Sequence, residues 1–203
     1  MGFLSKIFGT DPESQKKRAF EGFEQHFAGD FEMTNAAKAG WLTAVGNNFA
    51  LRNQFDQAIE YFKDAIKLST NHISAYVSLG MAYVAKGMFK EAIDVLENAN
   101  VLKKNIRESK IYTKIYTTAF KEQPYLLYIL NQNLHYALGT AYMEIGEKEK
   151  AVDHLEKTLK AIKEQKNLKE AGSINEQDWA QNERGMIKII ENTNQLLTRL
   201  KKD

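Results

Sequence analysis

The chain of 203 residues contains no cysteine, so disulfides, thiolate metal sites and a cysteine nucleophile are excluded. It contains two prolines, Pro12 and Pro124, and such a scarcity of helix breakers favours helices. No apolar run approaches the roughly 20 residues that cross a bilayer. The formal net charge of +2 is too small to indicate a nucleic-acid partner by itself. We therefore expect a soluble, cytoplasmic and mainly helical protein.

Patterns typical of catalysis and of cofactor or metal binding are missing as well. The histidines His26, His72, His135 and His154 are scattered, and none has the spacing to another that a metal site requires. Glycine-rich phosphate loops and nucleophile-elbow motifs are not found. We therefore predict a protein that is not an enzyme and that uses no cofactor and no metal. His135 lies at a packing position, where we expect a buried and hydrogen-bonded side chain.

Three stretches of the chain are near-copies of one another. They read FALRNQFDQAIEYFK at 49–63, YVAKGMFKEAIDVLE at 83–97 and YMEIGEKEKAVDHLE at 142–156. The second copy follows the first by 34 residues and the third follows the second by 59, so an insert of 25 residues separates the last two. A glycine three residues before each copy and an alanine within it agree on these offsets: Gly46, Gly80 and Gly139, with Ala58, Ala92 and Ala151.

Each copy has the periodicity of two packed helices. Positions 4, 7, 8 and 11 of the repeat share one helical face, and positions 20, 24 and 27 share a face of a second helix. The small residues at positions 8 and 20 allow the two backbones to approach closely. Gly87, Gly146 and Asn53 fall between the helices, where a chain reversal requires a positive φ. The repeats run over about 39–72, 73–106 and 132–165.

This pattern resembles the tetratricopeptide repeat (TPR), a helix–turn–helix unit of 34 residues. The resemblance covers three repeats, about half of the chain. The proline that is usual near position 32 is absent, and His135 replaces the large apolar residue at position 4 of the third repeat. The resemblance implies an all-α fold: a right-handed superhelical array of antiparallel helix hairpins, a TPR-like solenoid, with extra N-terminal, inserted and C-terminal helices.

Helix hairpins of this kind must be stacked and capped, so the flanking segments are expected to pack on the repeats. We expect an N-terminal apolar segment at 1–10, followed by a single helical domain at 11–203. Within the domain we expect an inserted helix at about 107–122 and a C-terminal capping helix at about 174–201. A further helix should start at Pro12 and pack on the first repeat through Phe20, Phe23 and Phe27.

By resemblance, the protein is a non-catalytic protein–protein interaction module, an adaptor or assembly scaffold whose first helices line a concave groove. The groove positions are small or apolar and almost uncharged, and two methionines suit adaptable apolar binding. We therefore predict that the partner is another protein that contributes an apolar peptide or helix. The predicted groove residues are Thr43, Asn47, Leu51, Ser74, Val77, Met81, Val84, Asn133, Tyr136, Thr140, Met143 and Glu144.

Several alternatives remain open at this point. The groove could be filled by the protein's own N-terminal segment, or the protein could be a self-associating, homo-oligomeric scaffold. Peripheral membrane contact is a further alternative, and its apolar residues would be Phe3, Leu4, Ile7 and Phe8. An anionic partner could instead contact a basic stripe on the inserted helix, although nucleic acid is not the expected partner. The stripe comprises Arg107, Lys110, Lys114 and Lys121.

Overall fold

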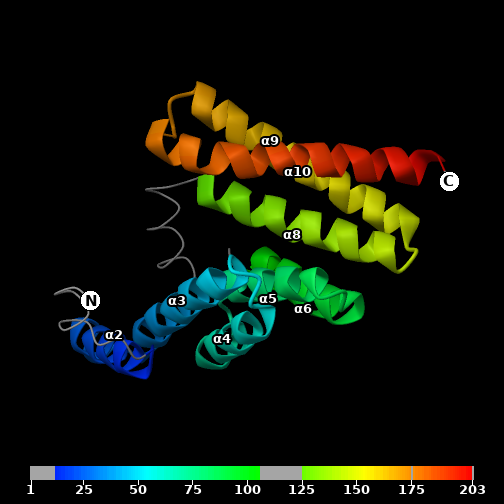
Figure 1. The fold of residues 1–203 in the computed structure, drawn as a ribbon. Helices are drawn as coiled ribbons and strands as arrows, with labels where there is room; N and C mark the ends of the chain where they lie inside the picture. Colours follow the sequence, from blue (N-terminus) through cyan, green and yellow to red (C-terminus); the bar gives the residue numbers. More distant parts are fainter. Residues whose placement is uncertain (1–11, 106–124, 175, 203) are drawn as a thin grey trace. The chain divides into compact units, whose positions relative to one another are not determined.

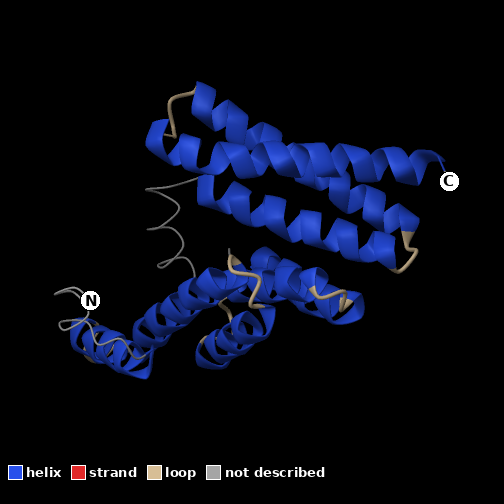
Figure 2. Ribbon diagram, in the orientation of Figure 1, coloured by secondary structure: helices blue, strands red, loops and turns tan. Residues whose placement is uncertain are grey.

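The computed structural model of the protein describes residues 12–105, 125–174 and 176–202. In this part of the chain every regular element is a helix, and no strand is found (Figure 2). The predicted all-α fold is therefore confirmed. The helices are α2 (Pro12–His26), α3 (Phe31–Ala50), α4 (Phe55–Leu68), α5 (Ile73–Ala85), α6 (Phe89–Asn105), α8 (Tyr125–Glu144), α9 (Lys148–Glu170) and α10 (Glu176–Lys202).

The chain forms two compact units, Met1–Ala75 and Tyr76–Asp203, and the division falls within α5. In unit 1, α2 packs on α3, and α3 packs on α4 to form the first hairpin (Figure 1). In unit 2, α6 packs on α8, α8 packs on α9 to form the third hairpin, and α10 packs on both α9 and α8. The second hairpin consists of α5 and α6.

The repeated glycines hold the two helices of each hairpin together. A Cβ atom added to Gly46 would lie 2.5 Å from the ring of Phe62, and one added to Gly139 would lie 2.7 Å from the side chain of Leu155. Real Cβ atoms do not approach so closely, so only glycine allows the large residue of the second helix to reach the first helix. The contacts pair repeat positions 8 and 24: Gly46 with Phe62, Gly80 with Leu96, and Gly139 with Leu155.

The reversals between paired helices have one shared geometry. Asn53, Gly87 and Gly146 have φ angles of 58°, 74° and 84°, as predicted for these positions. The next residue in each turn donates its backbone N–H to a carbonyl five residues earlier, a bond that closes the end of a helix. The bonds run from Gln54 to Phe49 (3.0 Å), from Met88 to Tyr83 (2.9 Å) and from Glu147 to Tyr142 (2.9 Å).

Helix ends agree with the repeat pattern except at α3, at α9 and at α8, which begins at Tyr125 and not near residue 132. The first helix of the first repeat begins at Phe31 rather than near residue 39, because Asp30 caps it by accepting a hydrogen bond from the Met33 N–H (3.0 Å). The polar stretch after residue 165 continues α9 to Glu170. The predicted inserted helix at 107–122 lies outside the described residues.

The flanking helices α2 and α10 pack on the repeats. Phe20 of α2 meets Trp41 of α3 edge to face, with ring centroids 6.0 Å apart. At the other end of the chain, α10 buries Met186 and Leu197, which are 3% and 8% exposed. Both helices cover apolar surface that a terminal hairpin would otherwise expose.

Candidate binding surface

In unit 1, the predicted groove residues differ in exposure. Thr43 is only 5% exposed, and its hydroxyl donates to the Ala39 carbonyl within the same helix (2.8 Å). Asn47 is exposed, and Leu51, at the C-terminal end of α3, is 83% exposed. Ser74, at the start of α5, is half-buried. Unit 1 therefore presents Asn47 and Leu51, whereas Thr43 belongs to the packed interior.

In unit 2, α5 exposes part of its predicted groove face. Met81 is 37% exposed, and Val84, one turn further on, is half-buried. Val77 is 3% exposed and lies in the interior. Gly80 of α5 packs against Leu96 of α6, and this contact fixes the rotation of α5 against α6.

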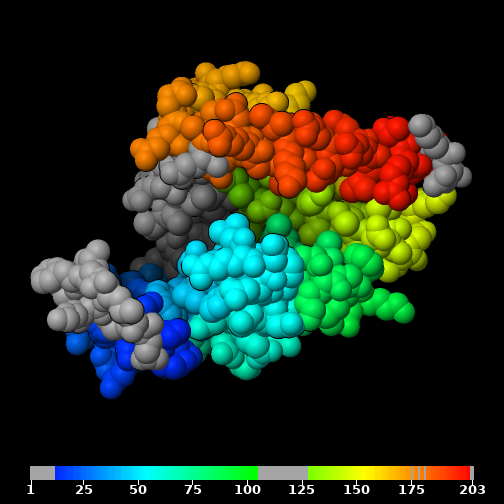
Figure 3. Space-filling model, viewed as in Figure 1, coloured from blue at the N-terminus to red at the C-terminus, as the bar shows by residue number. Residues whose placement is uncertain are grey.

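The predicted groove residues of α8 divide into two groups along the helix. Toward its N-terminal half, Asn133 and Tyr136 lie beside α10, and the Tyr136 hydroxyl accepts a hydrogen bond from Asn192 of α10 (3.2 Å). In Figure 3 the orange and red atoms of α10 run alongside the yellow-green atoms of α8. Toward the C-terminal end, Met143 is half-buried and Glu144 is exposed.

These observations leave only part of the predicted groove residues accessible to a partner. In unit 2 the groove residues that neither lie in the interior nor border α10 are called the open positions. They comprise three apolar side chains, one hydroxyl and one carboxylate. The open positions are Met81, Val84, Thr140, Met143 and Glu144.

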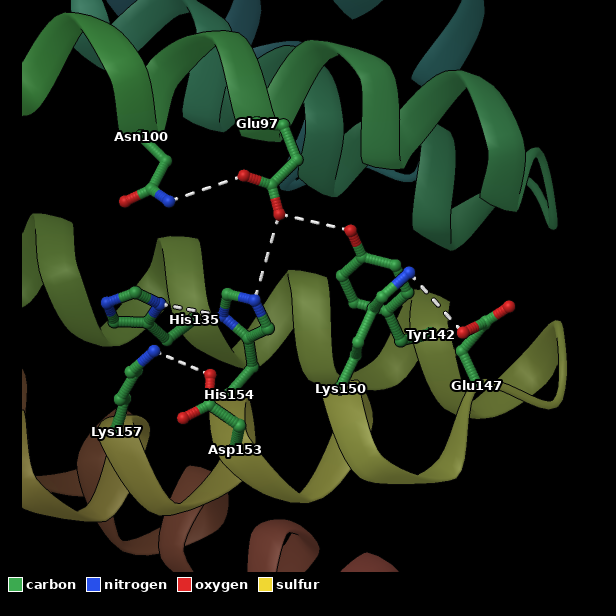
Figure 4. A network of polar contacts seen from close by, with 9 residues as sticks. All are labelled: Glu97, Asn100, His135, Tyr142, Glu147, Lys150, Asp153, His154 and Lys157. Atoms are coloured by element: carbon green, nitrogen blue, oxygen red, sulfur yellow. Dashed lines mark hydrogen bonds and ion pairs between the residues drawn. The ribbon is translucent and has the colours of Figure 1, made fainter.

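A polar network that the sequence did not reveal lies between α6, α8 and α9 (Figure 4). His135 and His154 are 9% and 7% exposed, and their Nδ1 atoms are 3.0 Å apart. The Nε2 atom of His154 lies 3.8 Å from Oε1 of Glu97. The same carboxylate accepts hydrogen bonds from the Tyr142 hydroxyl (3.1 Å) and from the Asn100 side chain (3.3 Å). Glu97 therefore anchors α6 to both helices of the third hairpin.

The contacts of the two imidazoles indicate their tautomers. Two facing Nδ1 atoms can form a hydrogen bond only if one carries a proton and the other does not. A proton on Nε2 of His154 points toward the Glu97 carboxylate, which leaves Nδ1 of His154 as the acceptor. His135 then donates from Nδ1. This assignment follows from the partners, and it requires the His154 ring to be neutral.

The surroundings of the pair hold both rings in the neutral form. Burial, with smaller contributions from Lys103, His154 and Lys157, lowers the pKa of His135 to about 3, whereas Asp153 opposes the shift. Burial also lowers the pKa of His154, against an opposing effect of Glu97. Lys157 is itself paired with Asp153 at 2.5 Å. The pair is thus a structural element at neutral pH.

Burial and the nearby Glu97 carboxylate raise the pKa of Tyr142 to about 12, so its hydroxyl keeps its proton and donates to Glu97. The sequence predicted a buried, hydrogen-bonded His135 but not its partner. His154 occupies repeat position 23, where the first repeat has Tyr61, so a comparison of positions 4 and 23 across the hairpin could have indicated the pair.

The described residues contain no group of three or more histidine, cysteine, aspartate or glutamate side chains arranged to hold a metal ion. None of the helices in the described ranges is both long and apolar enough to cross a membrane. Two predicted sets lie outside the described residues. They are the basic stripe, Arg107, Lys110, Lys114 and Lys121, and the N-terminal apolar residues, Phe3, Leu4, Ile7 and Phe8.

Comparison with known proteins finds two matches to tetratricopeptide-repeat family models. One covers residues 50–103, from the end of α3 through most of α6, and the other covers residues 134–170, which include most of α8 and all of α9. No curated protein matches the chain. Among solved structures, the crystal structure of the Sgt2 TPR domain from Aspergillus fumigatus is similar at 16% identity with a TM-score of 0.47, and the match covers 82% of this chain and 83% of that chain.

Proposed function

Because the chain belongs to the tetratricopeptide-repeat family, a fold that is in general a non-catalytic protein-interaction module, we propose that it binds an apolar segment of another protein. The family assignment confirms the resemblance that the repeated glycines and alanines indicated. The proposed role is that of an adaptor or assembly scaffold. Its partner would supply an apolar helix or extended peptide, which lies against the first helices of the hairpins.

The observation that carries this proposal is the partial exposure of apolar side chains at repeat positions 9 and 12. Met81 and Val84 of α5 and Met143 of α8 keep part of their surface accessible. The contacts of Gly80 with Leu96 and of Gly139 with Leu155 fix the rotation of these helices within their hairpins, so the helices cannot rotate to bury the apolar side chains without losing those contacts. Methionine adapts its shape to different apolar partners, which suits a peptide-binding surface.

The charge of the open positions indicates which charge the partner segment can carry. Glu144 is the one ionisable residue among them, and it is exposed. A partner with several acidic residues would meet this carboxylate and no cation among the open positions. We therefore propose an apolar segment that is neutral, or that carries a basic residue facing Glu144, rather than an acidic tail.

The test compares capture of partner proteins by the full chain and by two variants. Met81→Lys places a charge at an open position, whereas Val101→Lys makes the same kind of change at a residue of α6 that is 52% exposed and lies outside the open positions. We expect Met81→Lys to reduce the amount of captured protein by about tenfold or more, since loss of one apolar anchor costs at least about 1.4 kcal/mol. Val101→Lys should change it less than about twofold.

Captured proteins would be quantified by mass spectrometry and located on the chain by crosslinking, and circular dichroism would check that helix content is unchanged. Undiminished capture by Met81→Lys would show that the open positions are not the binding surface. Equal losses in both variants would show a general effect of added charge and would also contradict the proposal.

A further inference from the structure

Unit 1 contains a cleft of about 340 Å³ beside the first hairpin, here called the aromatic cleft. Trp41, Val45 and Phe49 of α3 line it together with Tyr61 of α4, and all four side chains are half-buried. Phe49 and Tyr61 stack with ring centroids 5.3 Å apart and an interplanar angle of 17°. The volume falls in the range of about 300–1,000 Å³ that is typical of binding pockets.

The aromatic cleft lies on a different side of α3 from the predicted groove. Trp41, Val45 and Phe49 are four residues apart and share one helical face, whereas Asn47 and Leu51 belong to another. Part of this face of α3 is hollowed by the aromatic cleft.

The N-terminal helix α2 covers only part of this face. Phe20 packs against Trp41, and Glu24 pairs with Lys38 at 2.5 Å. Pro12, at the other end of α2, lines the aromatic cleft itself. The chain segment that precedes Pro12 therefore joins α2 at the border of the cleft.

We propose that the aromatic cleft is the docking site of this chain's own first ten residues. The chain enters at Pro12, so the tether is short. Phe8 is four residues away and can reach about 6 Å as a helix or about 13 Å as an extended strand. Phe3, Leu4 and Ile7 supply further apolar side chains at spacings of one helical face.

The tether favours this occupant over an external one. A short linker gives the attached segment an effective concentration of the order of millimolar, which a separate partner seldom reaches. A membrane is a weaker competitor, because Lys6 is the one cation among the first ten side chains and attracts anionic lipid little. The segment thus completes the cap that α2 begins, and it is separate from the partner-binding surface proposed above.

The test uses Trp41 as a reporter of cleft occupancy in the full-length chain. Trp41 and Trp179 are the only tryptophans, so Trp179→Phe leaves a single fluorophore that lines the cleft. Replacing Phe3, Leu4, Ile7 and Phe8 by serine in that background should empty the cleft. We expect the acrylamide quenching constant of Trp41 to rise by about twofold or more, because a short tether keeps the site mostly filled.

Three outcomes would overturn the proposal. An unchanged quenching constant would mean that the segment does not cover Trp41. An equal rise in a Lys6→Ser control would mean that the effect does not depend on apolar docking. Protection of Trp41 that weakens on dilution would identify a second copy of the chain as the occupant. Helix content measured by circular dichroism would establish that every variant remains folded.

Discussion

The first and third hairpins place two rings in the same geometry but with different chemistry. At repeat positions 11 and 23, Phe49 and Tyr61 stack with centroids 5.3 Å apart and planes at 17°. Tyr142 and His154 stack at 5.6 Å and 19° at the equivalent positions of the third hairpin. The repeat therefore fixes the positions of the two rings but does not fix which ionisable groups they carry.

The difference extends to repeat position 4. Leu42 is 1% exposed in the first hairpin and needs no hydrogen-bonding partner, whereas His135 is 9% exposed and requires one. His154 is the hydrogen-bonding partner of His135, and the Glu97 carboxylate of α6 lies beside the other ring nitrogen of His154. A buried polar group is tolerated only when it is hydrogen-bonded, so the third hairpin depends on its neighbour α6 in a way that an apolar position 4 does not require.

The largest expected effect comes from giving the third hairpin the residues of the first. His135→Leu combined with His154→Tyr should remove an acid sensitivity of unit 2. Because the pKa values of both histidines are lowered from 6.5, that of His135 to about 3, the folded state excludes protons that the unfolded state binds. The resulting stability is present above pH 6.5 and is lost as the pH falls toward 3, at up to about 1.4 kcal/mol per pH unit for each histidine.

Urea unfolding between pH 7 and pH 4 measures this loss, and hydrogen exchange of α8 and α9 locates it. Burial lowers the pKa of His72 in unit 1 to about 4, but His72 is present in both proteins and contributes equally to each. His26→Gln, at an exposed histidine, is the matched control. Equal pH slopes for the double variant and the natural chain would contradict the prediction.

A smaller effect is expected at the glycines that both hairpins share. Gly46→Ala and Gly139→Ala should each lower the free energy of unfolding by about 1–3 kcal/mol, because the new Cβ would overlap Phe62 or Leu155. Gly185→Ala in α10 meets no neighbouring atom and should instead raise stability by about 0.5–1 kcal/mol. Thermal and urea unfolding provide the comparison. The prediction requires a lower free energy of unfolding for both hairpin variants and a higher one for Gly185→Ala. A change in the other direction in any of the three would contradict the packing described.

The smallest effect concerns the turns, where the hairpins differ by one residue. Asn53 and Gly146 both have positive φ, at 58° and 84°. Gly146→Ala should cost about 1–2 kcal/mol because alanine is strained in this conformation, whereas Gly146→Asn should cost less because asparagine tolerates it. The free energies of unfolding from urea titrations should rank glycine above asparagine and asparagine above alanine. An alanine variant as stable as the natural chain would show that the turn relaxes to another conformation.

Much of the hairpin architecture could be read from local patterns. The glycine contacts and the turns at Asn53, Gly87 and Gly146 follow from periodicity and from the φ angle that a reversal requires. The early start of α3 was missed, since apolar spacing is weak before residue 39 and the deciding signal is the single cap at Asp30. The burial of Thr43 and Val77 was missed as well, because the groove positions came from family resemblance and not from the rotation of these particular helices.

The sequence by itself determined that this protein consists of helix hairpins, because a spacing of three and four residues and a few small side chains leave one way to pair the helices. Only the tertiary structure decided which polar side chains of different helices contact each other. His135 and His154 are 19 residues apart, and Tyr136 and Asn192 are 56 apart. Contacts over such separations depend on the rotation and packing of whole helices, which periodicity does not encode.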